Sequence, residues 1–228
     1  MSNRPPNPGQ LALLALPLLL AAGCTGLFQS NARPEQTYVL RAPTPAAASA
    51  GTAAAAGAAA PAALLAPIQV LHPAAAPGLD GPHIMLVQAD RRMNFYLGSR
   101  WPAPLSDVVE ALAVESLRAS GEWQSVQDSG SAFTAEYALQ ISVRRFEADY
   151  SGGGAPTVNV VLDCTLGARE GRELVASFVA QGSAAAGSDR MSEVVAAFER
   201  ASSAALDSLV QQTGAAIRNS AQQGSAAR

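Results

Sequence analysis

Two long segments in the second half of the chain alternate apolar and polar residues, and they constrain the fold more than any other feature. They cover residues 137–150 and 158–166, and three consecutive glycines at residues 152–154 lie between them. Successive side chains of a β-strand point to opposite faces, so this period is typical of strands with one buried face. The sequence therefore predicts a long β-hairpin.

The apolar positions change phase within the first of these segments. They are odd-numbered over residues 139–143 and even-numbered over residues 146–150. One extra residue in a strand produces such a shift, so we expect a β-bulge at Arg144-Arg145. Shorter apolar runs bounded by turn residues are further strand candidates, at residues 68–71, 83–87, 93–97 and 174–180.

Two segments carry apolar residues at helical spacing. The first begins at Pro104, which suits the first turn of a helix, and ends before Gly121, a favourable stop. The second begins near Asp189, a good N-cap, and extends to about residue 214, before a polar, flexible tail over residues 215–228. Strands with two such helices predict an α+β fold, a mixed or antiparallel sheet with two amphipathic helices packed mainly on one face.

The first 23 residues have the pattern of a secretory signal peptide. Arg4 supplies a positive charge, and the apolar run over residues 11–22 is shorter than the roughly 20 residues that a membrane-spanning helix needs. Ala21, Ala22 and Gly23 supply the small residues of a cleavage site, so we expect cleavage between Gly23 and Cys24.

A cysteine directly after such a run resembles the attachment site of bacterial lipoproteins. The resemblance implies a diacylglyceryl thioether on Cys24 and a further acyl chain on its new amino group, which together give stable anchoring. Aspartate after the cysteine usually retains a lipoprotein at the inner membrane, and here the residue is Thr25. We expect the periplasmic face of the outer membrane. The alternative is an ordinary signal peptide in which the cysteine is incidental.

The mature chain is expected to contain one domain with two irregular segments before it. Residues 24–36 form a tether, and residues 37–41 form a first short strand of the domain. Residues 42–66 contain 15 alanines and no charge, which indicates a disordered insert of low complexity. Residues 67–214 hold the main part of the domain, and this length suits a single core.

Composition and motifs give no support to an enzyme, a metal site or a nucleic-acid-binding protein. The net charge is −3 and lysine is absent, whereas nucleic acid requires a strongly basic face. His72 and His83 stand apart from other ligand-type residues, and the sequence has no hydrolase, phosphate-loop or zinc-protease motif. We predict no catalytic residue, no metal and no cofactor beyond the covalent lipid on Cys24.

The remaining reactive side chains have structural interpretations. Cys164 occupies an inward position of an alternating strand, which favours a buried, inert thiol over a reactive one. Glu147 and Asp149 are interpreted as solvated strand residues rather than a paired acid and base.

Four residues near the third strand candidate are candidates for binding a partner: Arg92, Tyr96, Arg100 and Trp101. Arginine and large aromatic residues are enriched at binding hot spots, and the Arg91-Arg92 and Arg144-Arg145 pairs could bind an anionic headgroup or carboxylates. The alternative is that the aromatic side chains cover the sheet where the chain turns into the helix and that the arginines are solvated.

Several segments in this order resemble the ABC-type transport auxiliary lipoproteins, which accompany MCE (mammalian cell entry) lipid transport systems. They are the site at Cys24, the strand at residues 38–40, the stretch of residues 92–105 that contains Arg92-Met93-Asn94-Phe95-Tyr96 and Arg100-Trp101-Pro102, the strand at residues 145–150, and residues 194–198. The resemblance covers nearly the whole mature chain except the alanine-rich insert and the tail.

This resemblance implies a non-catalytic, lipid-anchored adaptor in the periplasm. Its partners would be an MCE-domain protein and the associated ABC permease and ATPase, which move phospholipids or other hydrophobic molecules across the envelope. The alternative function is a lipid-binding carrier that holds an acyl chain in an apolar cavity between sheet and helices.

Overall fold

The computed structural model describes residues 34–42 and 64–226, with side chains through Gln223. The predicted signal peptide, Cys24, and most of the predicted tether and insert lie outside these residues, and their boundaries stay predictions. The domain described below begins at Glu35.

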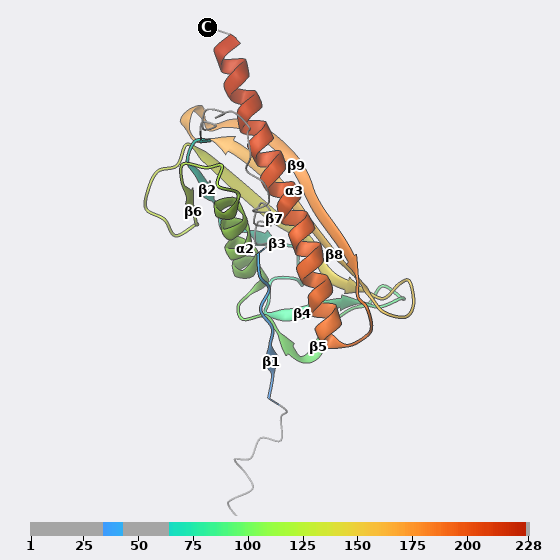
Figure 1. Ribbon diagram of the computed structural model, residues 1–228. Helices are drawn as coiled ribbons and strands as arrows, with labels where there is room; N and C mark the ends of the chain where they lie inside the picture. The colour runs from blue at the N-terminus through green and yellow to red at the C-terminus, as the bar shows by residue number, and fades with distance from the viewer. Residues whose placement is uncertain (1–33, 43–63, 227–228) are drawn as a thin grey trace, which may run out of the picture. The chain divides into compact units, whose positions relative to one another are not determined.

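Three long antiparallel strands form one half of the sheet (Figure 1). They are β7 (Tyr137–Asp149), β8 (Thr157–Ala168) and β9 (Glu173–Ala185), with a short 3-10 turn, η1 (Glu170–Arg172), between the last two. The pairing of β7 with β8 runs from Tyr137 opposite Ala168 to Asp149 opposite Thr157. This arrangement confirms the predicted hairpin.

The predicted bulge is also confirmed. Val143 lies opposite Leu162 and Arg145 lies opposite Val161, so Arg144 is the extra residue on β7. The inward side chains are odd-numbered before this point and even-numbered after it, and Val143 and Phe146 are both buried. A change of phase in a sequence pattern therefore located a real backbone irregularity.

Short strands complete the sheet on the other side of β7, and the first three pair with successive parts of it in parallel: β2 (Ile68–Val70), β3 (Ala74–Ala75) and β4 (His83–Val87). Beyond them, β5 (Met93–Arg100) is antiparallel to β4, while β1 (Gln36–Thr37) is parallel to β5 and β6 (Val126–Gln127) is parallel to β2. The sheet is therefore mixed, as predicted.

Two helices cover one face of this sheet and contact each other (Figure 1). Helix α2 (Leu105–Ser120) follows Pro104 and ends at Gly121, whose φ of 67° is the left-handed conformation that favours glycine at a helix end. It packs on β2, β3 and β6, whereas α3 (Met191–Ala226) packs along β8 and β9. The α+β fold class is confirmed.

An aromatic cluster lies between α3 and the sheet. Trp101, which follows β5, meets Phe146 of β7 edge-on at a ring-centroid distance of 6.0 Å and Phe198 of α3 at 5.2 Å. Phe146 and Phe198 stack at 5.3 Å. All three side chains are at most 2% exposed, so the cluster joins the helix to both halves of the sheet.

The first strand is displaced from its predicted position at residues 37–41. Gln36 and Thr37 pair with Ser99 and Arg100, at the very end of β5. Pairing stops there because β5 does not continue into Pro102, which has no backbone N–H to donate. Leu40 is nevertheless 7% exposed and Tyr38 packs against the core, so these two side chains join the core without forming a strand, whereas Val39 is 62% exposed.

The domain is also longer at its other boundaries than predicted. Helix α3 continues to Ala226, beyond the predicted end near residue 214, because Ile217 is 3% exposed and packs into the core. At the predicted insert, Ala42 is buried and Leu65 forms a parallel bridge to Trp123. Both ends of that insert therefore belong to the domain.

Candidate functional site

The β4–β5 hairpin carries an exposed apolar strip. Its members are Met93, Phe95 and Leu97, which are 49%, 38% and 86% exposed. The ring of Phe95 stacks on His83 at a centroid distance of 4.5 Å, which fixes its orientation. We call these three side chains the β5 strip.

A backbone irregularity makes the end of this strip protrude. His83 lies opposite Arg100, but the next pair joins Met85 and Phe95, so β5 has several extra residues between these two pairs. Gly98 lies in this stretch with a φ of 69°, and no atom lies within 4 Å of the position of an added Cβ. Leu97 therefore stands on a bulge that projects from the sheet.

The turn between β4 and β5 holds two arginines. Arg91 has a φ of 66°, and its backbone N–H donates to Gln88 at 2.8 Å. The side chain of Arg92 contacts Asp90 at 2.5 Å, and its backbone N–H donates to the same carboxylate. These hydrogen bonds hold the pKa of Asp90 below its usual range. Arg92 is exposed, as a partner-binding residue must be.

Arg100 lies at the opposite end of β5 and connects it to the start of the domain. Its guanidinium contacts the carboxylate of Glu35 at 3.3 Å, one residue before β1. It also donates to the carbonyl oxygen of Trp101 at 3.4 Å. The side chain is partly exposed, so it remains available for a partner while it orients the N-terminal segment.

Tyr96 faces the helices rather than solvent. Its phenolic oxygen lies 2.8 Å from that of Tyr150, which donates a hydrogen bond to the carboxylate of Asp189. Burial and then the bond to Tyr150 raise the pKa of Tyr96. The side chain connects β5 to the chain just before α3, which is a structural role that the sequence pattern did not reveal.

Trp101 requires a correction. This side chain is 1% exposed and lies at the centre of the aromatic cluster, so it offers no surface to a partner. Of the two interpretations of the sequence, the one in which the aromatic side chain covers the sheet is right for Trp101. The signal that could have shown this is the position of the tryptophan between a strand and a helix.

Glu147 also differs from the prediction of a solvated strand residue. It is 3% exposed, and its carboxylate accepts hydrogen bonds from Arg145 at 2.6 Å and from the backbone N–H of Phe146 at 2.8 Å. Burial raises its pKa against the opposing effect of Arg145. The hydrogen bond from Ser151, by contrast, lowers the pKa of Asp149.

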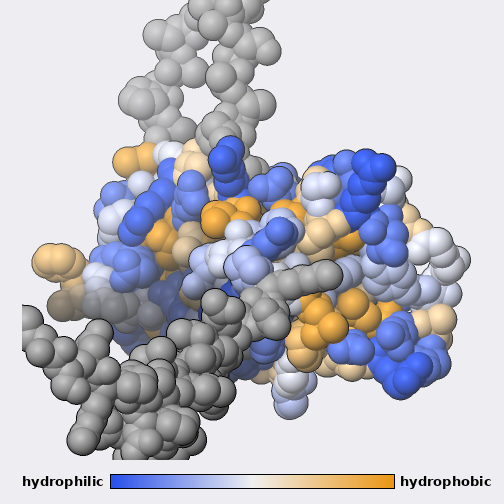
Figure 2. All heavy atoms as spheres, turned by 90° about the horizontal axis from the view of Figure 1, so that it is seen from below, coloured by the Kyte–Doolittle hydropathy of each residue, from blue (hydrophilic) through white to orange (hydrophobic). Residues whose placement is uncertain are grey.

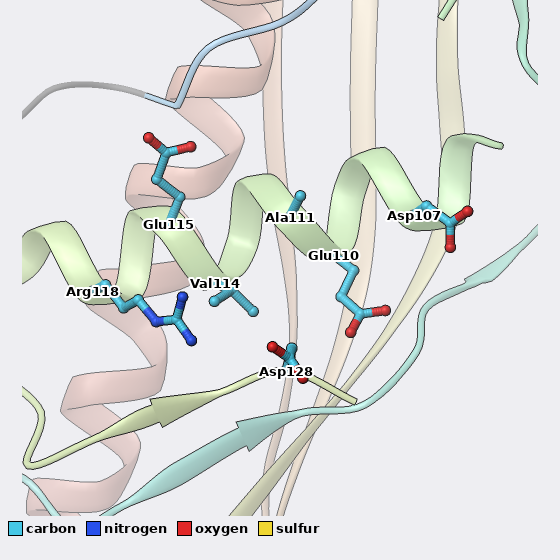
Figure 3. A pocket seen from close by; sticks show the side chains of 7 residues that line it. All are labelled: Asp107, Glu110, Ala111, Val114, Glu115, Arg118 and Asp128. Carbon is cyan, nitrogen blue, oxygen red and sulfur yellow. The ribbon is translucent and has the colours of Figure 1, made fainter. Parts of the chain in front are cut away.

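A second feature is an acidic groove of about 570 Å³ along α2. Figure 3 shows Glu110, Val114 and Arg118 directed from α2 toward the side on which Asp128 lies. His72 contacts Glu110 at 2.9 Å. The sequence alone could not show this contact, because the two residues are far apart along the chain. Burial raises the pKa of Glu110, but hydrogen bonds from Ser129 and His72 bring it below its usual value.

The groove and the rest of the described residues contain no group of three or more metal-ligand side chains placed to hold an ion. Arg118 in the groove is already bound to the carbonyl oxygen of Val126 at 2.9 Å. The predicted burial of Cys164 is confirmed, since it is 1% exposed and burial raises the pKa of its thiol to about 12. That thiol is a poor nucleophile at neutral pH.

Neither described helix contains an apolar stretch long enough to cross a bilayer.

Comparison with protein families decides the identity of this domain. A family model described as the ABC-type transport auxiliary lipoprotein component matches residues 38–212. The chain belongs to this family. The match extends from the segment after β1 into α3 and includes the hairpin, α2, the first part of α3 and the aromatic cluster. A search of the curated proteins gives no match.

Two solved structures resemble the chain in fold. Protein XCC0632 from Xanthomonas campestris resembles the chain with a TM-score of 0.64 and 28% identity, over 72% of this chain and 93% of that one. The crystal structure of an uncharacterized protein has a TM-score of 0.58 and 13% identity, over 79% and 99% of the two chains, and shows likeness of fold alone.

Proposed function

We propose that this auxiliary lipoprotein is the periplasmic adaptor subunit of an MCE-type ABC transport system. The lipid on Cys24 would hold it at the outer membrane, and its α+β domain would bind the periplasmic end of the MCE protein. Phospholipids or other hydrophobic molecules are the proposed cargo of that system.

The observation that carries the proposal is the family match over residues 38–212, which begins soon after the predicted lipid site. A transport auxiliary needs a binding surface and a defined location, and it needs no catalytic group. Two arginines of the β4–β5 hairpin, the exposed Arg92 and the partly exposed Arg100, supply candidate contacts for a partner.

The packing of the domain favours an adaptor over a lipid-binding carrier. A carrier needs a large apolar cavity. Between the N-terminal half of α3 and the sheet, the aromatic cluster of Trp101, Phe146 and Phe198 fills the space, with each side chain at most 2% exposed. An acyl chain would have to displace these side chains.

The proposal is tested in cells that carry the complete transport operon. The full chain should fractionate with the outer membrane, and detergent extracts should yield MCE subunits together with it. Cys24→Ala should remove the protein from the outer membrane while its domain stays folded. Cys164→Ala is the matched control, since it changes the second cysteine and should leave the location unchanged. Repeated purification without MCE subunits would contradict the adaptor role.

A further inference from the structure

We infer that the β5 strip, together with the arginines of the β4–β5 turn, is a lipid-surface contact that holds the domain against the membrane to which it is tethered. The inference rests on the lipid attachment at Cys24 in the proposed function. It adds a second, non-covalent contact on the folded domain itself, with phospholipid as its ligand.

The exposure of the strip is the first step of the argument. An isolated exposed apolar residue is normal on a protein surface, but a group of them on one element marks a contact site. Met93, Phe95 and Leu97 alternate along β5, and Leu97 is 86% exposed at the projecting bulge. Figure 2 views the molecule from the side on which β1 and β5 lie in Figure 1, and it shows hydrophobic patches between hydrophilic side chains.

The position of the strip relative to the tether is the second step. Ser99, two residues after Leu97, is the register partner of Gln36 in β1. The chain from Thr25 to Gln36 reaches at most about 40 Å when fully extended. The projecting bulge is thus the part of the domain next to the point where the tether joins it. A lipid on Cys24 would therefore keep the bulge within reach of the bilayer, no farther from it than the extended tether allows.

Charge is the third step. Arg91 is exposed, and none of the ion pairs among the described residues includes it. It adjoins Arg92, and both lie next to Met93 at the start of the strip. Apolar side chains flanked by arginine fit a bilayer surface, because the apolar groups enter the acyl boundary while the guanidinium groups meet phosphates.

The size and shape of the strip favour lipid over a protein partner. A specific protein interface buries roughly 800 Å² on each side, and three partly exposed side chains offer far less than this. The bulge is also convex, and no atom crowds the space around Gly98. A projecting apolar tip suits shallow insertion into a fluid surface, which needs no complementary groove.

The test uses the full, lipidated protein in vesicles of phosphatidylethanolamine and phosphatidylglycerol. Leu97→Cys provides a labelling site for an environment-sensitive fluorophore. The sulfur of Cys24 is occupied by lipid, and Cys164 is 1% exposed, so the label goes to position 97. Lipids with a quencher in the headgroup region should quench this label strongly. Phe133→Cys is the matched control, because Phe133 is 79% exposed in the loop before β7.

The control position lies at the other end of the sheet. Tyr137, near Phe133, and Glu147, in register with the Met85–Phe95 pair, are about 30 Å apart along β7. A label at position 133 should therefore stay accessible to water-soluble quenchers. A second arm replaces Arg91 and Arg92 by alanine, which should weaken quenching at position 97 in anionic vesicles and leave it unchanged in zwitterionic ones.

Equal quenching by lipid at positions 97 and 133, or none at position 97, would overturn the inference. If the label at position 97 is shielded from water-soluble quenchers only when MCE protein is added, the inference is also overturned, and the strip is a protein contact instead. Mass spectrometry of the same samples shows whether Cys24 carries lipid. A chain without this lipid would contradict the proposed anchor, which is a different outcome from failure of the β5 strip to contact lipid. With Leu97→Asp, the domain should leave the vesicle surface about 10 to 100 times more often, the factor expected for losing one buried leucine.

Discussion

The phenolic oxygens of Tyr96 and Tyr150 lie 2.8 Å apart, and the hydroxyl of Tyr150 donates onward to Asp189. This chain of hydrogen bonds connects β5, the residue after β7, and the residues just before α3. The hairpin that carries the β5 strip is thereby fixed to the helical face of the domain. Breaking the chain at its middle member should have a larger effect than changing an exposed tyrosine.

We predict that Tyr150→Phe lowers the free energy of unfolding by about 1 to 3 kcal/mol, because it removes two hydrogen bonds and leaves the half-buried hydroxyl of Tyr96 unpaired. Urea denaturation measures this change. Tyr38→Phe is the control, since Tyr38 bonds Gln36 at the surface, and its effect should stay below about 0.5 kcal/mol. Equal effects of the two substitutions would show that the chain of bonds adds no stability.

The raised pKa of Tyr96 predicts a dependence of stability on alkaline pH. The ordinary pKa is 10.0, and the folded state favours the neutral phenol. The contribution of Tyr96 is therefore fully present below this pH and is lost as pH rises above it, where the unfolded chain releases the proton first. Tyr96→Phe should flatten the fall of the unfolding free energy above pH 10.0. An unchanged slope would contradict the assignment.

Gly182 is predicted to be intolerant of any side chain. A Cβ there would lie 2.0 Å from the carbonyl oxygen of Ala201 and 2.9 Å from the backbone nitrogen of Ala205, both in α3. Gly182→Ala should therefore push the helix from β9 and cost about 3 kcal/mol or more, which thermal or chemical denaturation would detect. Gly152→Ala is the control, because nothing lies within 4 Å of its Cβ position, and it should be neutral within about 1 kcal/mol.

Arg145 is predicted to stabilise the domain mainly through Glu147. Arg145→Ala leaves a buried carboxylate with its backbone bond alone, and we expect a loss of about 2 kcal/mol at neutral pH. This loss is less than the 3 to 5 kcal/mol that removing one partner of a fully buried ion pair costs, since Arg145 is itself 46% exposed. Arg144→Ala, which removes an exposed contact to Asp163, should cost less than about 0.5 kcal/mol.

The pH dependence of that loss gives a second readout. Burial raises the pKa of Glu147 above its ordinary 4.5, so the neutral form is favoured in the folded state. The contribution of Glu147 to the free energy of unfolding is therefore present below pH 4.5, and it declines as pH rises through the pKa that Glu147 has in the folded state. Without Arg145 this decline should become steeper, so the loss from Arg145→Ala should be smaller in acid than at neutral pH. A loss independent of pH would assign the effect to packing of the arginine.

The long elements of this fold could be predicted because their periods extend over many residues. The hairpin of β7 and β8, its bulge at Arg144 and helix α2 each follow from a repeated pattern or a helix-ending glycine. The two-residue strands β3 and β6 could not be predicted, because two residues carry no period and their pairing depends on neighbours distant in sequence.

The orientation of individual site residues was harder to predict than the elements that carry them. In β5, Tyr96 faces the helices while the apolar Leu97 is 86% exposed, and the sequence pattern alone does not reveal which of the two sides is covered. The burial of Glu147 depends on Arg145 and on the backbone beside the bulge in β7.

The C-terminal part of α3 is predicted to belong to the cooperative unit of the domain, although its composition is that of a tail. Ile217 is 3% exposed, and Arg218 contacts Glu122 at 2.9 Å, close to the C-terminal end of α2. Ile217→Ala should cost about 2 to 4 kcal/mol, as for other buried aliphatic side chains, and a chain that ends at Gly214 should lose at least as much. A chain that ends at Gln223 is the control and should unfold like the full chain within about 0.5 kcal/mol. If the chain ending at Gly214 is as stable as the full chain, the last turns of α3 are a separate helix with no part in the core.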